Sequence, residues 1–365
     1  LLSSENCTVA ITAVSPWNSN PVILLKFFPV KQNLLYLLFQ FSYKLSSSFH
    51  PEVKGATMPA SKTYLALLTV LTILISIAPL SGQTGAKNIW TAGILTGPSP
   101  FELSTPEGVT NPVLTAAAVS DLDVTIVAHP FLAVTDSMFY MFFTAKNDTV
   151  SQGGIGLAQS RDGLRWTYRR IVIDEPYDLS YPFVFQWDGT YYMIPEAHTE
   201  TSVRLYRAVE FPDRWVYERD LLTGDHFISS TLVRFNERWW LFTAREGNET
   251  LRLFMADSLT GPWTEHPQSP VVARDLNTAR PAGRPFVLDG VLYRLGQDCD
   301  PTYGNQVRAF RITEISPATY REEMIETPLV KATGRGWNSE AMHHVDFHSL
   351  GGGRGIAVVD ALGRP

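Results

Sequence analysis

The stretch Ser180–Glu196 reads SYPFVFQWDGTYYMIPE, and the fold follows from it. Apolar and aromatic residues stand on both sides of Asp188-Gly189, at positions 183–185 and 191–194. An Asp-Gly pair between two such runs is a strong signal for the two-residue turn of a β-hairpin. The segment is therefore predicted to form two antiparallel strands joined by a tight turn.

Four other segments repeat this pattern, at residues 128–143, 229–242, 283–294 and, more weakly, 343–359. The positions that match Pro182 are 130, 231, 285 and 345, so the five units follow one another at steps of 52, 49, 54 and 60 residues. A repeat of about fifty residues, each built on a hairpin, is typical of four-stranded propeller blades. The sequence thus predicts an all-β fold, a five-bladed β-propeller.

Further strands are predicted outside each hairpin. Residues 154–160 and 166–168 are joined by the turn Arg161-Asp-Gly163, residues 203–206 pair with 215–217, and residues 251–256 precede Trp263. The segment Ile89 to Asp121 is interpreted as an entry strand with a connector. First and last strands of propellers often share one blade, which would close this ring.

The composition and net charge of the chain exclude some classes of function. The 365 residues are 45% hydrophobic and 18% charged, an ordinary globular balance. A formal charge of −6 and a pI near 5.8 disfavour general nucleic-acid binding, which requires clustered Lys and Arg. We expect no nucleic-acid partner.

The N-terminal part divides at Met58, the first methionine. Residues 1–57 are interpreted as a doubtful leader outside the mature protein. Residues 58–82 combine Lys62, an apolar run at 64–80 and a small, polar exit, which predicts a cleaved signal peptide or, alternatively, an uncleaved signal anchor. We therefore expect the chain in the lumen of the Golgi or ER or outside the cell, with membrane contact only through this segment.

Two glycosylation sequons support this localisation, Asn147-Asp-Thr149 and Asn248-Glu-Thr250. Both lie next to predicted strand ends. Of the two cysteines, Cys7 lies in the doubtful leader and Cys299 stands alone, so no disulfide is expected within the propeller.

Several motifs carry a family resemblance: SRDGLRW at 160–166, LSYPF at 179–183, YYMIPE at 191–196, VRLYR at 203–207, GPWTEHP at 261–267, RPAGR at 280–284, and Gln297-Asp-Cys followed by Tyr303-Gly304. Over about residues 88–361 the chain resembles the N-terminal domain of plant glucosamine inositolphosphorylceramide transferases. That domain is itself similar to the five-bladed propellers of family 43 glycoside hydrolases.

The resemblance implies a binding role. In the plant enzymes a separate C-terminal domain transfers the sugar, and if the sequence is complete at Pro365 we expect no such transfer by this chain. We expect the propeller to recognise a glycan or a glycolipid headgroup, through its sugar or inositol phosphate. Two alternatives remain open, a divergent glycoside hydrolase and a scaffold for a separate glycosyltransferase.

Topology predicts where the site lies. If the first strand of each blade begins on one face of the disc, the antiparallel second strand ends on that face. The strand starts predicted to ring this mouth are His129, Tyr181, Ser230, Arg284 and His344. The second strands add Glu196, Arg245 or Glu246, and Gln297-Asp298.

The hydrolase alternative needs two carboxylates, one to protonate the leaving oxygen and one to activate water or attack the sugar. The family 43 resemblance places an Asp before the first blade's Pro, where this chain has His129. Glu196 and Asp298 are the remaining candidates for acid and base, with His129 assisting. Since Asp178 precedes the LSYPF motif where related domains tend to have His, we hypothesise that His129 and Asp178 face each other.

The candidate ligand-binding residues are Tyr181, Asp178, Ser230, Arg280, Arg284, Gln297, Tyr303 and His344. Arg280 and Arg284 could bind a phosphate or carboxylate bidentately or tie blades together. Glu196 could instead pair with Arg204 or Arg207, and Asp298 could bond to the Tyr303-Gly304 turn. His343-His344 lacks a companion ligand set, so we expect no metal and no other cofactor.

Overall fold

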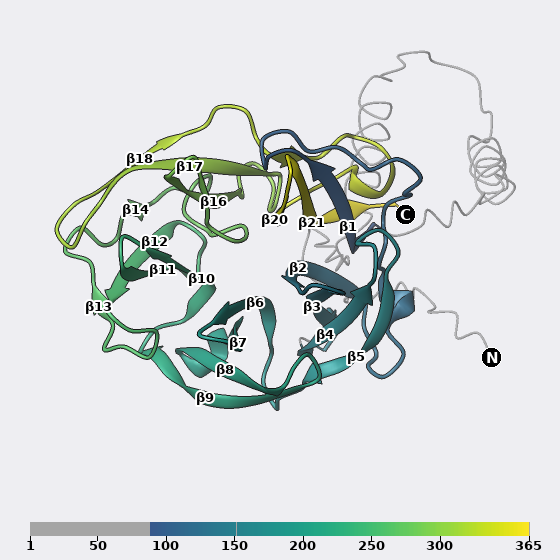
Figure 1. The fold of residues 1–365 in the computed structure, drawn as a ribbon, viewed down its shortest axis with the longest axis horizontal. Helices are drawn as coiled ribbons and strands as arrows, with labels where there is room; N and C mark the ends of the chain where they lie inside the picture. The colour runs from purple at the N-terminus through teal and green to yellow at the C-terminus, as the bar shows by residue number, and fades with distance from the viewer. Residues whose placement is uncertain (1–87, 151, 365) are drawn as a thin grey trace, which may run out of the picture. The chain divides into compact units, whose positions relative to one another are not determined.

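The computed structural model describes residues 88–150 and 152–364, and the doubtful leader and the predicted signal segment lie outside this range. The described residues form strands and three short 3₁₀ turns, η1 (Ala116–Ala118), η2 (His198–Glu200) and η3 (Gly336–Asn338). They include no helix with the length and hydrophobicity needed to span a bilayer. Five small sheets surround a common centre, which confirms the predicted five-bladed propeller (Figure 1).

The first three blades follow the chain in order. Blade one contains β2 (Ile126–Val134), β3 (Phe139–Asn147), β4 (Gln152–Ser160) and β5 (Thr167–Ile173). Blade two contains β6 (Ser180–Trp187), β7 (Thr190–Glu196), β8 (Ser202–Glu210) and β9 (Arg214–Thr223). Blade three contains β10 (Phe227–Phe235), β11 (Arg238–Arg245), β12 (Thr250–Ala256) and the short β13 (Thr264–Glu265) and β14 (Val272–Ala273).

The last two blades depart from the four-stranded pattern. Blade four contains β15 (Phe286–Leu288), β16 (Val291–Asp298), β17 (Gln306–Ile315), β18 (Tyr320–Met324) and β19 (Val330–Lys331). Blade five contains only β20 (Val345–Gly351), β21 (Arg354–Gly363) and β1 (Ile89–Gly97). The N-terminal strand β1 runs antiparallel to β21, from the pair Ile89 and Gly363 to the pair Gly97 and Gly355, and so closes the ring.

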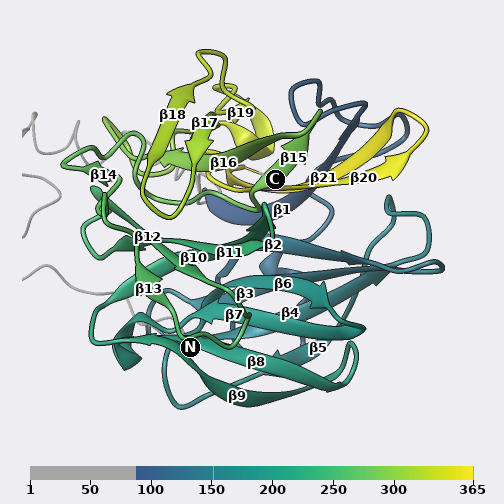
Figure 2. The ribbon, with the colours of Figure 1, turned by 60° about the vertical axis from the view of Figure 1, so that its left-hand side comes forward.

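The hairpin that predicts the fold has the expected turn. Asp188 and Gly189 both have positive φ, 47° and 74°, and they connect the paired residues Trp187 and Thr190. Two successive positive φ angles define the turn whose twist matches that of the flanking strands. Figure 2 shows the strands of blade two in the order β6, β7, β8 and β9, with β9 at the outer edge.

The hydrophobic core lies between neighbouring blades, because each twisted sheet presents alternate side chains to the sheets on either side. The largest cluster, which includes Phe142, Phe183, Met193 and Leu241, joins blades one, two and three. In blade four the inner strand begins late. Gly283 stands in its place with φ of 139°, and a Cβ there would lie 1.8 Å from the carbonyl oxygen of Val345. Only glycine allows blades four and five to approach so closely.

Candidate functional site at the mouth of the propeller

The inner strands of blades one to three begin with the same irregularity. His129, Tyr181 and Ser229 have φ of 48°, 48° and 50°, and the register of each hairpin shifts beside them. A non-glycine residue with positive φ inside a strand is uncommon and marks a β-bulge that redirects the chain. The bulges lie at the start of each inner strand, on one face of the disc, and we call this face the mouth.

Each of these bulges turns a backbone N–H toward a side chain of the preceding blade. His129 N–H donates to Asp360 Oδ2 at 2.8 Å, and Tyr181 N–H donates to Thr144 Oγ1 at 3.0 Å. Ser229 N–H donates to Glu196 Oε2 at 2.8 Å. Glu196 thus acts as one of three repeated acceptors that join neighbouring blades.

Comparison of equivalent hairpin positions shows which blade lacks such an acceptor. Thr144 pairs with Ala128 and Glu196 pairs with Ser180, so the two acceptors occupy equivalent places in their hairpins. The equivalent residue in blade three is Ala244, which has no side-chain acceptor. The hydroxyl of Tyr181 accepts instead, from Gly283 N–H at 2.7 Å. Tyr181 therefore connects blade two to blade four across the centre, as a buried residue of the mouth.

Aromatic rings stack at the mouth beside Tyr181. The imidazoles of His129 and His343 lie parallel with centroids 4.7 Å apart, and Trp90 covers the other side of His343 at 3.9 Å. Tyr303 meets His343 edge-on at 5.4 Å and remains 42% exposed. The mouth is thus a layered stack of rings with one exposed member.

Three buried polar atoms in this region have no hydrogen-bond partner among the described residues: His129 Nε2, His344 Nδ1 and Gln297 Nε2. Burial lowers the pKa of His344 to about 4, and burial with the neighbouring His343 holds the pKa of His129 well below its usual value. Both imidazoles are therefore neutral at pH 7. His344 Nε2 lies 2.9 Å from Pro130 O, which can only accept, so His344 Nδ1 is an unprotonated acceptor. Native proteins rarely leave such atoms unpaired, and water or a ligand hydroxyl would satisfy them.

His129, His343 and Asp360 offer ligand atoms within 4.8 Å of one another, close enough to share a metal ion. His343 Nδ1 already lies 2.7 Å from Asp360 Oδ1. Imidazole lone pairs lie in the ring plane, so the two parallel rings direct them side by side rather than toward a common centre. His129, His343 and Asp360 thus contact one another directly, through ring stacking and hydrogen bonds.

Arg280 lies at the mouth, and each of its three nitrogens has a polar neighbour there. Nε donates to Ser229 Oγ at 3.0 Å, Nη1 donates to Asn248 Oδ1 at 2.9 Å, and Nη2 lies 3.6 Å from Glu196 Oε2. The guanidinium also lies 5.5 Å from the centre of the Tyr303 ring. Arg280 therefore supports the exposed tyrosine and joins blades two, three and four.

Arg284 lies inside the central channel, away from the Arg280 cluster. Nε donates to Asp346 Oδ1 at 2.6 Å, and Nη2 donates to the carbonyl oxygens of Val184 at 2.7 Å and Leu132 at 3.3 Å. The same Asp346 accepts from Leu132 N–H at 2.6 Å. Arg284 thus links blade four to blades one, two and five. Of the two roles predicted for this residue, anion binding or joining blades, these contacts fit the second.

The remaining candidates are placed as follows. Asp178 pairs with Lys146 at 2.6 Å, and no hydrogen bond or ion pair joins it to His129 among the described residues, so the contact hypothesised for these two is absent. Ser230 is buried and bonds to Thr243 at 2.8 Å. Asp298 accepts from Gln306 at 2.6 Å, and its backbone carbonyl accepts from Asn305.

The alternative ion pairs of Glu196 are not formed. Arg204 pairs with Glu200 and Asp220, and Arg207 pairs with Glu218. The sequence reasoning also missed Thr144, Asp360 and Asp346. The repeat itself held part of the signal, because Thr144 and Glu196 both stand 14 residues after the prolines at 130 and 182.

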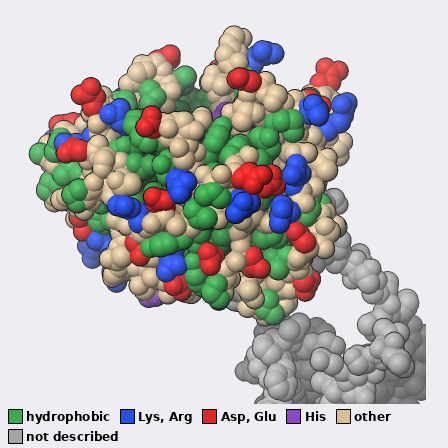
Figure 3. All heavy atoms as spheres, turned by 60° about the horizontal axis from the view of Figure 1, so that its bottom comes forward, with side chains coloured by type: hydrophobic (Ala, Val, Ile, Leu, Met, Phe, Trp, Pro, Cys, Tyr) green, Lys and Arg blue, Asp and Glu red, His purple; other side chains and the backbone are tan. Residues whose placement is uncertain are grey.

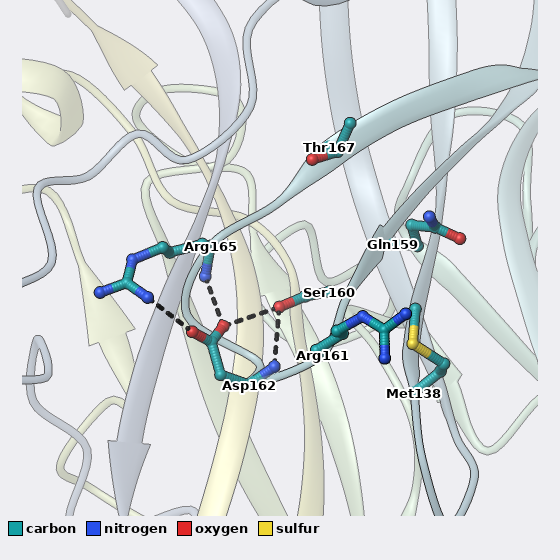
Figure 4. Close-up of a pocket in the computed structure, with 7 residues that line it drawn as sticks. All are labelled: Met138, Gln159, Ser160, Arg161, Asp162, Arg165 and Thr167. Carbon is teal, nitrogen blue, oxygen red and sulfur yellow. Dashed lines mark hydrogen bonds and ion pairs between the residues drawn. The ribbon is translucent and has the colours of Figure 1, made fainter.

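Two hollows open on the surface. One, of about 390 Å³, is lined by Gly224, Asp225, Arg245, Thr250, Arg252 and Pro270. The other, of about 260 Å³, lies beside the turn of blade one (Figure 4). There Asp162 accepts from Ser160 and from the backbone of Arg165, so the turn uses most of its own polar groups. Acidic and basic side chains are mixed over the face drawn in Figure 3.

The first hollow belongs to the mouth face. Arg245 ends β11 and Thr250 begins β12, and the loop between them contains Asn248, which Arg280 holds. The second hollow adjoins Ser160, at the end of β4, whose partner Phe139 begins β3 at the opposite face. The mouth and the 390 Å³ hollow are therefore neighbouring parts of one surface.

The fold is that of the five-bladed propellers found among glycoside hydrolases. The catalytic domain of a Coprinopsis cinerea family 62 α-L-arabinofuranosidase has the same fold, with a TM-score of 0.51 at 12% identity over 75% of this chain and 97% of that one. Zg3597, a family 117 glycoside hydrolase of Zobellia galactanivorans, gives a TM-score of 0.46 at 14% identity over 67% of this chain and 88% of that one. At these identities the similarity concerns the fold alone.

Sequence comparison identifies the family. The family described as glucosamine inositolphosphorylceramide transferase 1, N-terminal, matches residues 83–362, and the chain belongs to it. Glucosamine inositolphosphorylceramide transferase 1 of Oryza sativa subsp. japonica is 37% identical over 295 residues, and that of Arabidopsis thaliana is 36% identical over 314 residues. These matches cover 74% and 78% of this chain but 40% of each relative, so the chain spans about two fifths of their length.

Proposed function

We propose that this propeller recognises carbohydrate at its mouth, as the sugar part of a glycolipid headgroup. The observation that carries the proposal is Tyr303, a residue that is 42% exposed at the mouth and whose ring lies against His343 and Arg280. An aromatic ring that is fixed and partly exposed offers an apolar face to a sugar ring at low entropic cost. The names of the relatives contain a sugar, glucosamine, and a lipid, inositolphosphorylceramide, and agree with this ligand class.

The buried polar atoms around the stack support the same ligand class. His129 Nε2, His344 Nδ1 and Gln297 Nε2 need partners, and His344 Nδ1 needs a donor. A hydroxyl group both donates and accepts, whereas an ionised phosphate only accepts. The sequence-based prediction of a secretory or extracellular location also fits a protein that meets glycolipids.

Hydrolysis receives less support from the geometry. Glu196 Oε2 accepts from Ser229 and lies beside Arg280, and Asp298 Oδ2 accepts from Gln306. Both carboxylates are held by neighbouring blades or strands, and the acid of a glycoside hydrolase must carry and release a proton. Recognition therefore remains the function that we propose.

A glycan and glycolipid array tests the proposal with the whole chain printed here. We compare the parent protein with Tyr303→Ala at the mouth and with Tyr217→Ala, a control at an exposed tyrosine of the outer strand β9. We expect binding by the parent and by the control and its loss in Tyr303→Ala, with folding checked by circular dichroism. Absence of binding by the folded parent would reject recognition and leave the scaffold alternative.

A further inference from the structure

The 390 Å³ hollow on the mouth face contains an arginine that the protein itself does not fully use. Arg245 has a side chain that is 62% exposed, and its Nε lies 3.3 Å from Asp225 Oδ1. Its two terminal nitrogens make no hydrogen bond with the described residues. The guanidinium therefore presents a free pair of donors to the hollow.

Asp225, the ion-pair partner of this arginine, is itself held by its neighbours. Its Oδ1 accepts from His226 N–H at 2.9 Å, and its Oδ2 accepts from Arg252 Nη1 at 3.0 Å. Arg252 is itself fixed, because Nε and Nη2 donate to the two oxygens of Glu265 at 2.8 and 2.6 Å. With Asp225 beside Nε at 3.3 Å, the two terminal nitrogens of Arg245 remain available to a bidentate ligand.

The other two arginines predicted to bind an anion are already committed. Arg280 uses its three nitrogens toward Ser229, Asn248 and Glu196, and Arg284 is enclosed in the channel by Asp346 and two carbonyl oxygens. An anion at either residue would displace interactions that join blades. Arg245 is the member of these three that can accept a new partner.

We propose that this hollow binds the phosphate group of the ligand whose sugar lies at Tyr303. The inference rests on the proposed function and adds to it a second contact point. Paired Arg donors match two phosphate oxygens, and Thr250 lines the same hollow. The loop from Arg245 to Thr250 carries Asn248, which bonds to Arg280, and Arg280 lies against Tyr303. The two contact points are thus neighbours.

The acidic residues of the hollow limit its affinity for free phosphate. Asp225 and Glu265 offset the charges of Arg245 and Arg252, so no strong positive field gathers free phosphate. We expect inorganic phosphate to bind weakly and a phosphorylated polyol to bind more tightly, because the polyol adds contacts of its own. Inositol phosphate is the soluble probe that combines both groups.

Calorimetric titration of the whole chain with inositol phosphate, inorganic phosphate and inositol tests the inference. Arg245→Gln removes the paired donors, and we expect its affinity for inositol phosphate to fall at least about tenfold. Arg245→Lys keeps the charge without the fork and should recover only part of the affinity. Arg165→Gln, at an exposed arginine that pairs with Asp162 beside the hollow of the opposite face, is the matched control and should leave the affinity unchanged.

Two results would overturn the inference while leaving the proposed function intact. One is equal binding of inositol and inositol phosphate. The other is a chain that binds neutral glycans on the array but binds no phosphorylated probe more tightly, or does so equally well in Arg245→Gln. If the folded chain binds neither neutral nor phosphorylated probes, both proposals fail together.

Discussion

The N–H of Gly283 donates a hydrogen bond of 2.7 Å to the hydroxyl of Tyr181, 102 residues earlier in the chain. This bond connects blade four to blade two, whereas the bulges of blades one to three bond to the blade directly before them. Ala244 stands where blade three would otherwise provide an acceptor. Tyr181, which was predicted to line the mouth, therefore stabilises the ring of blades by joining blades two and four.

Tyr181→Phe should destabilise the propeller. The substitution leaves the buried N–H of Gly283 without a partner, which costs about 1–3 kcal/mol. The free energy of unfolding from urea denaturation measures the loss. Tyr217→Phe, at an exposed tyrosine of β9, should change it by less than about 0.5 kcal/mol. Equal effects of the two substitutions would contradict the role assigned to the cross-ring bond.

Arg284→Met should cost more, because it leaves the fully buried carboxylate of Asp346 without its main counter-charge. Removing one partner of a buried ion pair typically costs about 3–5 kcal/mol. The double variant Arg284→Met with Asp346→Asn removes the orphaned charge, so it should be more stable than the single variant. A double variant that is less stable by the sum of the two single effects would show that the pair is not coupled.

Glu196 separates a structural from a catalytic interpretation. Glu196→Gln keeps an oxygen that can accept from Ser229 N–H but removes the charge beside Arg280, so we expect a loss of about 1–3 kcal/mol in the free energy of unfolding. Hydrolysis of an aryl-glycoside panel is measured in parallel. Activity in the parent that disappears in a variant of unchanged stability would support the hydrolase alternative.

Acid should destabilise the protein below about pH 6.5. Burial lowers the pKa of His344 to about 4, so between these values the unfolded chain binds a proton that the folded chain does not. Stability therefore falls as the pH falls through this window, by up to about 3 kcal/mol for this group. His129, whose pKa is also lowered by burial, acts in the same direction.

Asp346 extends this loss of stability with falling pH to lower pH values. Burial raises the pKa of Asp346, but the charges of Arg284 and His348 lower it by a larger amount. The net pKa is therefore well below the usual range. Its contribution is present above about pH 4 and is lost as the pH falls. Thermal denaturation of the parent and of His344→Gln between pH 4 and 8 measures the histidine share, and an identical slope in both would contradict it.

The two sequons should behave differently in a eukaryotic secretory host. Asn147 is 7% exposed, and its Nδ2 donates to Asp123 at 2.9 Å, so a sugar at this atom has no room in the folded protein. Asn248 lies in the partly exposed loop after β11, and its Oδ1, not its Nδ2, is engaged by Arg280.

We therefore expect secreted, folded protein to carry a glycan at Asn248 and none at Asn147. Glycosidase treatment followed by mass analysis of Asn147→Gln and Asn248→Gln distinguishes the two sites. Folded protein that is glycosylated at Asn147 would contradict the prediction.

The sequence by itself determined the architecture of this protein. Alternating apolar residues around Asp188-Gly189, and their return at about fifty-residue steps, specify hairpins and their number through local turn chemistry and side-chain period. These signals are local, so they survive without knowledge of the fold. The family resemblance of the quoted motifs was also confirmed.

Tertiary structure alone decided which polar side chains are free. Glu196, Arg280 and Arg284 have the residue types of a binding site, yet each forms bonds with residues of other blades, up to 152 positions away in the chain. Whether a guanidinium is satisfied depends on such distant acceptors, which leave no periodic trace in the sequence. For that reason Arg245, named only among the second-strand ends, emerged as the available arginine once the blades were assembled.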